Sequence, residues 1–120
     1  MVELSLKPYP GRLCLATTRK DFEKASQKVI GRKVSAEALL ANDGRVLIRT
    51  ENDTRFKTYL VWVNTRKAVV HEAAHVVLDV FEGAGIAPNE ANGEPFAYML
   101  GYVVEQIESH WEKGKRKKKR

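Results

Sequence analysis

The sequence predicts an α+β fold, in which a small, mostly antiparallel sheet carries an N-terminal helix, a central helix and a C-terminal helix packed on one face. Three observations predict it. The 120 residues suffice for one domain with a single core, and 43% of them are hydrophobic. Apolar residues alternate with a period of two over 56–63. They recur at helical spacing over 66–82 and 94–111.

The N-terminal part of the chain is expected to hold one strand and one helix. Residues 1–11 contain two prolines and a glycine, which predict an irregular entry. Residues 12–16 form a short apolar run typical of a strand. A pair of threonines then offers an N-cap for a helix over 20–30, and Gly31 ends it.

The middle of the chain predicts the rest of the sheet. The apolar stretches 38–41 and 46–49 flank Asn-Asp-Gly at 42–44, a sequence typical of a tight hairpin turn. A second turn over 51–54 leads into 56–63, where large apolar and other residues alternate. We therefore expect a sheet of three or four strands.

Two helices are predicted to complete the domain. Thr65 supplies N-cap chemistry for a helix over 66–82, which Gly83 ends. A loop that includes Pro88 follows. The last helix is expected over 94–111, with a proline in its first turn, where its missing N–H costs nothing.

The composition favours a soluble, cytoplasmic protein. No apolar run is long enough to cross a membrane, and the N-terminus lacks the pattern of a signal peptide. Cys14 is the only cysteine, which excludes an internal disulfide and fits a reducing compartment. We interpret Cys14 as a core residue, since it lies in a predicted strand with no partner motif.

The positive charge of the chain is concentrated at its C-terminus. The net charge is +6, and seven of the eight residues 113–120 are Lys or Arg. Such a run repels itself and has no apolar face to bury. We therefore expect a folded domain over 1–112 and a disordered basic tail over 113–120. The tail would add a salt-sensitive, non-specific attraction to nucleic acid.

The central helix carries the motif His71-Glu72-Ala-Ala-His75, which predicts a zinc site. Two histidines four residues apart project from one helix face, so their rings can reach one Zn²⁺ ion. Glu72 points beside the ion, where its carboxylate can take a proton from water. The alternative is an amphipathic helix that happens to carry two histidines and a surface-paired glutamate.

A catalytic zinc site needs a third protein ligand and an open position. His110 lies far along the chain, next to the basic tail, whereas Glu94 opens the last helix. An antiparallel return after His75 would bring Glu94 to face it, so we favour Glu94. The alternative role of Glu94 is to complement the helix dipole in the first turn. Valines surround the two motif histidines, so we expect the imidazoles to be buried and to need a partner.

The motif and the segment that follows resemble the gluzincin branch of the zincin metallopeptidases. The resemblance rests on His-Glu-Ala-Ala-His at 71–75 and Gly-Glu-Pro-Phe-Ala-Tyr at 93–98, and it extends over 34–108. It implies a minimal single-domain protein in which Glu94 completes a two-His, one-Glu site. Short phage-derived proteins are similar in the same pairing of motifs.

The chain departs from the gluzincin pattern at the residues that support the site. Gluzincins often place an aspartate four residues after the ligand glutamate, where this chain has Tyr98. Asp79 is a candidate substitute that would orient a histidine, or else a solvated helix residue. Tyr98 and Tyr102 are candidates for stabilising the oxyanion, or else core aromatics.

The resemblance implies a zinc-dependent metallopeptidase in which His71, His75 and Glu94 bind Zn²⁺ and Glu72 is the general base. Its substrate is a peptide or protein that adds as a strand to the sheet edge, either at 56–63 or at 45–50. The alternative is a non-catalytic zinc-containing protein that docks to nucleic acid or an acidic partner through its basic tail.

Overall fold

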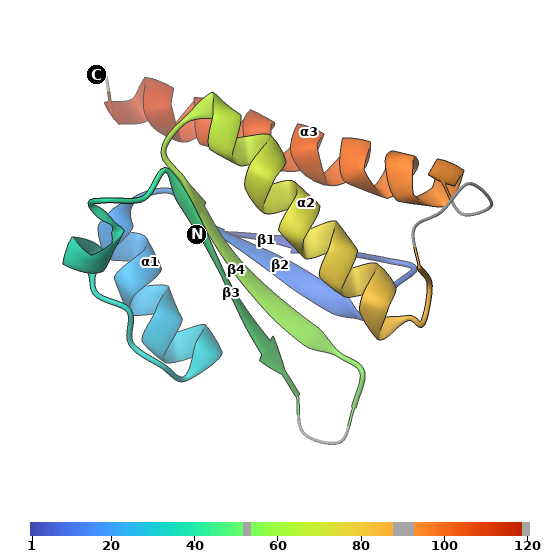
Figure 1. The fold of residues 1–120 in the computed structure, drawn as a ribbon. Helices are drawn as coiled ribbons and strands as arrows, with labels where there is room; N and C mark the ends of the chain where they lie inside the picture. Colours follow the sequence, from blue (N-terminus) through green and yellow to red (C-terminus); the bar gives the residue numbers. More distant parts are fainter. Residues whose placement is uncertain (52–53, 88–92, 119–120) are drawn as a thin grey trace.

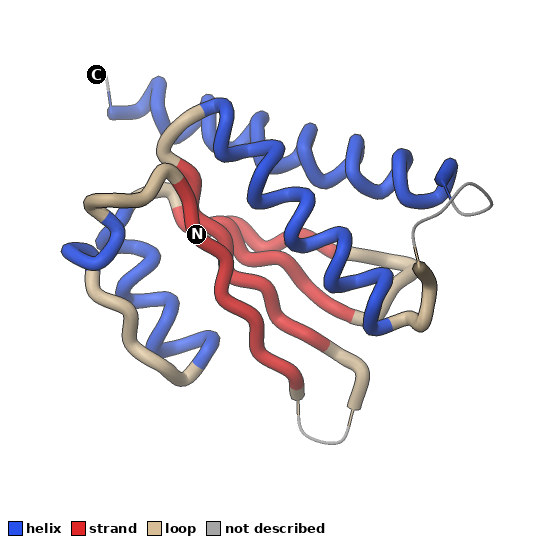
Figure 2. The backbone as a smooth tube through the Cα atoms, viewed as in Figure 1, coloured by secondary structure: helices blue, strands red, loops and turns tan. Residues whose placement is uncertain are grey.

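The computed structural model describes residues 1–51, 54–87 and 93–118, with side chains as far as Lys113. Four strands form one sheet in the order β1-β2-β4-β3 (Figures 1 and 2). The outer pairs, β1 with β2 and β3 with β4, are antiparallel, while the central pair of β2 and β4 is parallel. The predicted α+β class with a mostly antiparallel sheet is confirmed.

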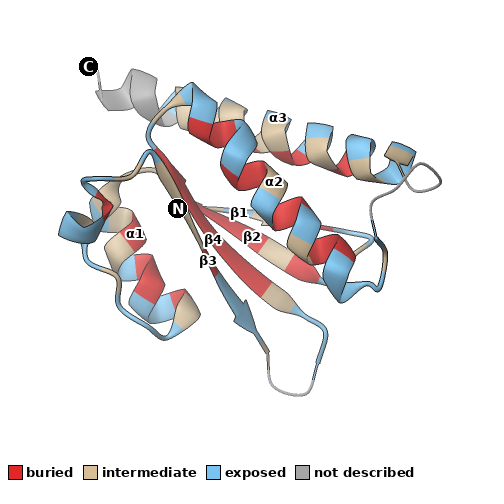
Figure 3. Ribbon diagram, in the orientation of Figure 1, coloured by how far each residue is buried: buried red, intermediate tan, exposed pale blue. Residues whose placement is uncertain are grey.

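The helices cover both faces of the sheet, not one face as expected. Alternate residues of β2 and β4 enter two separate cores: Leu13 and Val61 pack under α2 and α3, whereas Cys14 and Leu60 pack under α1. The reason is that these two central strands are apolar at nearly every position, so each face of the sheet needs a cover (Figure 3). Cys14 is fully buried, as expected of a core residue.

The first half of the chain contains one strand more than predicted. β1 (Val2–Ser5) lies at the sheet edge beside β2 (Gly11–Ala16), in the segment expected to be irregular. The alternation of half-buried and exposed residues in β1 covers only four residues, and two prolines follow it closely. The sequence alone therefore does not predict a strand there. α1 (Arg19–Ala25) begins at the predicted threonine cap and continues as a π-helical turn to Ile30, where Gly31 adopts a left-handed conformation.

The predicted hairpin around Asn-Asp-Gly is wrong in its first arm. Residues Ala36–Leu39 form a short 3₁₀ helix capped by Ser35, so only the second arm is a strand, β3 (Gly44–Thr50). The Ser35 hydroxyl accepts a hydrogen bond from the Ala38 N–H and favours the helical turn. The true hairpin joins β3 to β4 (Lys57–Val63) across the second predicted turn.

The two C-terminal helices lie side by side on one face of the sheet. α2 (Arg66–Gly83) begins at the predicted Thr65 cap and ends as predicted. α3 (Gly93–Lys118) runs antiparallel to α2 (Figure 1). It continues past the expected boundary at residue 112, and the disorder expected of 113–120 stays a prediction. Pro88 lies outside the described residues. Within the described ranges, no helix is both long and apolar enough to cross a membrane.

Candidate metal and catalytic centre

The motif helix lies above the half of the sheet that ends in the free edge of β3. α2 packs on β3 and β4, while α3 lies over the other half, where the Tyr102 hydroxyl reaches the Ser5 carbonyl on β1 at 3.5 Å. Because β3 is the last strand of the sheet, its outer backbone groups have no neighbouring strand. The motif face of α2 therefore borders an open sheet edge.

The two motif histidines are exposed, which corrects the expectation that their rings are buried. The side chain of His71 is 68% exposed, and His75 is exposed too. The valines near them in the sequence face the core on the opposite side of the helix, apart from Val70, which is exposed. Burial of the rings therefore supplies no reason for a metal, and the case for one rests on geometry.

The two imidazoles converge on one point. The Nε2 atom of His75 lies 3.2 Å from the Nε2 atom of His71, and the rings meet edge to face. Two Zn–N bonds of 2.0–2.1 Å at a tetrahedral angle hold their nitrogens about 3.3–3.4 Å apart. The spacing is therefore compatible with two ligands of a tetrahedral zinc ion when both rings are neutral, and equally with a hydrogen bond between the rings in which one Nε2 donates.

Glu72 enters the site from the buried side of the same helix. Only 8% of its side chain is exposed, and its Oε1 atom lies 3.9 Å from the Nε2 atom of His71. Burial raises the pKa of the Glu72 carboxyl, and the nearby His71, His75 and Arg45 oppose that rise. A mostly buried carboxyl beside two imidazole nitrogens is a candidate for a group that takes and returns a proton.

A glycine on β3 leaves the space that Glu72 occupies. A Cβ atom on Gly44 would lie 2.9 Å from the Glu72 Cγ atom, closer than real Cβ contacts. It would also lie 3.1 Å from the Trp62 carbonyl oxygen and 3.2 Å from the Ala68 Cβ atom. The start of β3 therefore leaves no room for a side chain where the strand meets α2.

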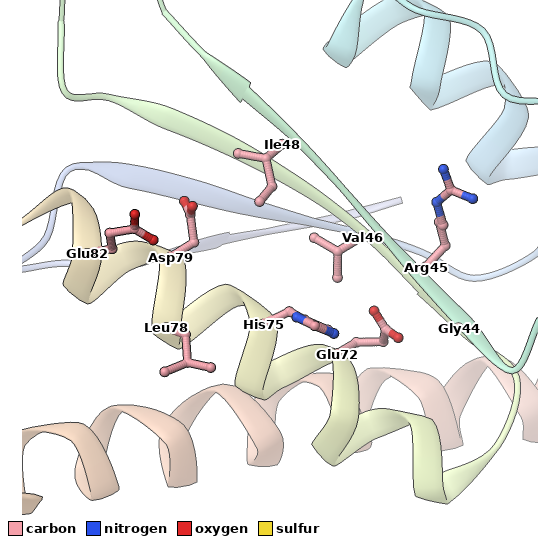
Figure 4. A pocket seen from close by; sticks show the side chains of 9 residues that line it. All are labelled: Gly44, Arg45, Val46, Ile48, Glu72, His75, Leu78, Asp79 and Glu82. Atoms are coloured by element: carbon pink, nitrogen blue, oxygen red, sulfur yellow. The ribbon is translucent and has the colours of Figure 1, made fainter. Parts of the chain in front are cut away.

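A cleft of about 460 Å³ runs between β3 and the motif face of α2. In Figure 4, Glu72 and His75 point from the helix toward the strand at one end, and Asp79 and Glu82 lie at the other. The strand contributes Val46 and Ile48 to the wall. The complete lining is Gly44, Arg45, Val46, Ile48, Glu72, His75, Leu78, Asp79 and Glu82. The cleft thus lies between the motif residues and the free sheet edge.

Asp79 does not take either of its expected roles. Its Oδ2 atom accepts hydrogen bonds from the Tyr59 hydroxyl at 2.6 Å and from the Lys57 ammonium at 3.0 Å. Both partners come from β4, so Asp79 ties α2 to the sheet. Burial and the Asp79 carboxylate raise the pKa of the Tyr59 phenol far above its ordinary value, so this hydroxyl stays protonated.

Glu94 is not close to the histidine pair. It is exposed at the start of α3, and among the described residues no three His, Cys, Asp or Glu side chains are grouped to hold a metal ion. Phe96 packs on Phe81, with ring centroids 5.5 Å apart, which aligns the start of α3 with the end of α2. Six residues, about 9 Å of helix, separate His75 from Phe81. Of the three protein ligands expected for zinc, the structure therefore brings only His71 and His75 together.

The other aromatic and histidine candidates also lie away from the cleft. Tyr98 is 76% exposed and Tyr102 is 42% exposed, so neither is a core aromatic, and both belong to α3. Neither lines the cleft that holds Glu72. His110 lies between Glu108 and Glu112 on α3. Both of these glutamates pair with Arg66 in the first turn of α2.

Sequence reasoning named 45–50 as one of two possible substrate edges but missed the approach of the start of β3 to Glu72. Gly44 and Arg45 approach Glu72 from that strand, although the Arg45 side chain points away from α2 in Figure 4. The only sequence signal was the glycine itself, which we assigned to a hairpin turn. A glycine at the first residue of a strand also marks a close approach of two backbones.

Comparison with known proteins adds no relative. No protein-family model, no curated protein and no solved structure matches the chain. The resemblance to gluzincins therefore rests on the residues of the two motifs.

Proposed function

We propose that the protein is a zinc-dependent metallopeptidase that hydrolyses peptide bonds in the cleft between α2 and β3. The observation that carries this proposal is the 3.2 Å approach of the His71 and His75 Nε2 atoms, with the Glu72 carboxylate beside them. Two imidazole nitrogens at a spacing compatible with zinc, next to a buried carboxylate, supply two of the three protein ligands and the base that metal-assisted hydrolysis requires.

His71 and His75 would bind Zn²⁺ as neutral imidazoles. When bound, the ion supplies Lewis-acid chemistry, since it polarises a carbonyl group and lowers the pKa of water. Glu94 is the proposed third ligand on the strength of the resemblance alone. Because it lies near the end of α2, its recruitment would require the first turn of α3 to move toward the histidines.

Glu72 would act as the general base and then as the general acid. Its carboxylate takes a proton from the attacking water and returns it to the leaving amine. Its position supports both steps, because the Glu72 Oε1 atom lies 3.9 Å from the Nε2 atom of His71, beside the place where the ion would be held. Gly44 supports the role by leaving room for this side chain.

The substrate would bind as an extended strand along β3. Of the two edges considered from the sequence, β4 is paired on both sides, whereas β3 has one free edge, and the cleft lies along it. Backbone groups of β3 would bond the peptide main chain and hold a scissile carbonyl near Glu72. The buried single thiol Cys14 is consistent with a cytoplasmic protein, which we include in the proposal.

The variant Glu72→Gln tests the proposal. It keeps the size of the side chain and removes the basic oxygen, so we expect unchanged zinc content and a loss of casein or peptide cleavage of at least about 100-fold. His110→Ala is the matched control and should leave both measurements unchanged. A zinc-loaded wild type that cleaves no peptide would instead favour a non-catalytic zinc protein that docks through its basic tail.

A further inference from the structure

We propose that Glu82 determines substrate specificity by binding a Lys or Arg side chain about three residues from the scissile bond. This inference rests on the proposed function, because it concerns the far end of the same cleft. Glu82 lines the cleft from the last turn of α2 and is exposed there. His75 and Glu72 lie toward the other end (Figure 4).

The charge at this end of the cleft comes from Glu82. Asp79 also lines the cleft, but its Oδ2 atom is bonded to the Lys57 ammonium at 3.0 Å and to the Tyr59 hydroxyl at 2.6 Å. The Lys57 charge offsets that of Asp79. Within the described part of the chain, Glu82 has no ion pair, so its carboxylate is available to a cationic side chain.

Helix stability does not explain an acid at this position. The last turn of α2 holds no basic residue, and the partial negative charge of a helix C-terminus repels a carboxylate there. The interaction of Glu82 with its own helix dipole is therefore unfavourable. A cation bound in the cleft would reverse that unfavourable interaction.

The distance between His75 and Glu82 along α2 can be expressed as a number of residues of an extended peptide. Seven residues separate His75 from Glu82, which is about 10.5 Å along a helix. A strand advances about 3.3 Å per residue, so the two ends of the cleft are about three peptide residues apart. Val46 and Ile48 line the strand side between them, so an aliphatic residue is expected next to the scissile bond and the basic residue about three positions away.

Digestion of a mixed peptide library by the zinc-loaded protein tests this assignment. We expect Lys and Arg to be enriched about fivefold over Glu at the third position on one side of the cleaved bond, because an exposed carboxylate attracts a cation and repels an anion only modestly. Glu82→Gln should abolish the enrichment, and Glu82→Lys should reverse it. Glu37→Lys, on the short 3₁₀ helix away from the cleft, is the control with the same charge change.

A binding measurement separates this inference from the proposed function. Fluorescence anisotropy with Glu72→Gln compares two labelled peptides that differ only in Lys or Glu at the third position. Tighter binding of the Lys peptide, reversed by an added Glu82→Lys change, supports the inference even if no peptide is cleaved. Cleavage without charge preference, or equal binding of both peptides, overturns the role of Glu82. In the first of those cases the peptidase function stands.

Discussion

At the scale of single residues, the site depends on what α2 and β3 place opposite each other. His71 and His75 follow from the helical repeat of the motif, since side chains four residues apart share a face. The position of Glu72 also follows from the helical repeat, but the surroundings of its side chain do not. Burial raises the pKa of its carboxyl, and the space for its side chain is left by Gly44, which belongs to another element.

The glycine at position 44 provides a test of that environment. Gly44→Ala would place a Cβ atom 2.9 Å from the Glu72 Cγ atom, so Glu72 must move or the strand must shift. We expect a loss of about 1–3 kcal/mol of unfolding free energy, as for other overpacked sites. We also expect a larger loss in kcat than change in KM, because the carboxylate is displaced. Chemical denaturation and steady-state kinetics measure the two effects.

Two further variants make this test specific. Gly101→Ala on α3 meets no atom within 4 Å and sits within a helix, so it should stabilise the protein by about 0.5–1 kcal/mol. In the background of Glu72→Ala, the cost of Gly44→Ala should shrink, because the clashing Cγ atom is gone. An unchanged cost in that background would show that Glu72 is not the constraint on Gly44.

At the scale of elements, α2 is held over the sheet by packing and by one polar contact. Its inner face is apolar and contributes to the core shared with α3, whereas Asp79 bonds to Lys57 and Tyr59 of β4. This contact lies two helical turns from Glu72 and fixes the rotation of α2 about its own axis. The direction in which the motif points therefore depends on a strand that contains no motif residue.

Tyr59→Phe tests the polar contact through its dependence on pH. At pH 7 the variant should lose about 1.5–3 kcal/mol, the usual worth of a hydrogen bond to a charged group. The folded-state pKa of Tyr59 is raised above its unfolded value near 10, so this stabilisation is complete below pH 10 and falls as the pH rises. The fall is about 1.4 kcal/mol per pH unit for one phenol.

The difference between wild type and Tyr59→Phe isolates this phenol from the other titrating groups. Urea unfolding at pH 7, 9, 10 and 11 should show a constant gap up to about pH 9 and a narrowing gap above pH 10. A gap that stays constant to pH 11 would mean that Tyr59 titrates normally in the folded protein and that the bond to Asp79 contributes little.

At the scale of the whole molecule, local patterns predicted the elements better than their arrangement. The caps at Thr18 and Thr65 and the stop at Gly31 act within a few residues, so the sequence reveals them. The parallel pairing of β2 with β4 joins strands more than forty residues apart, which no local pattern encodes. That pairing makes both strands internal, and because both of their faces are apolar, α1 and α2 cover opposite faces.

The same distinction applies to the site. The motif histidines are local and were predicted, and their Nε2 atoms do converge. The free edge of β3 follows from sheet order and was predicted only as one of two possible edges, while the cleft and the place of Gly44 in it were not predicted. Glu94 depends on how α3 aligns with α2, and the Phe81–Phe96 contact sets that alignment so that Glu94 lies beyond the histidines.

Zinc binding should raise the stability of the whole domain, because an ion that binds only the folded state shifts the unfolding equilibrium. At a free zinc concentration 100 times Kd, the gain is about 2.7 kcal/mol. For a domain of this size, each kcal/mol raises Tm by roughly 3–5 °C, so we expect a shift of about 10 °C. Differential scanning calorimetry with added zinc or with EDTA measures it.

Three alanine variants show which side chains carry that shift. His71→Ala should lose it almost entirely and cost little without zinc, since the ring is exposed. His110→Ala should retain the shift. Glu94→Ala should lose most of the shift if Glu94 is the third ligand and should keep it if His71 and His75 bind zinc without it. A wild type whose Tm does not respond to zinc would contradict the metal site, because both histidine nitrogens already stand at ligand spacing without any rearrangement of α2.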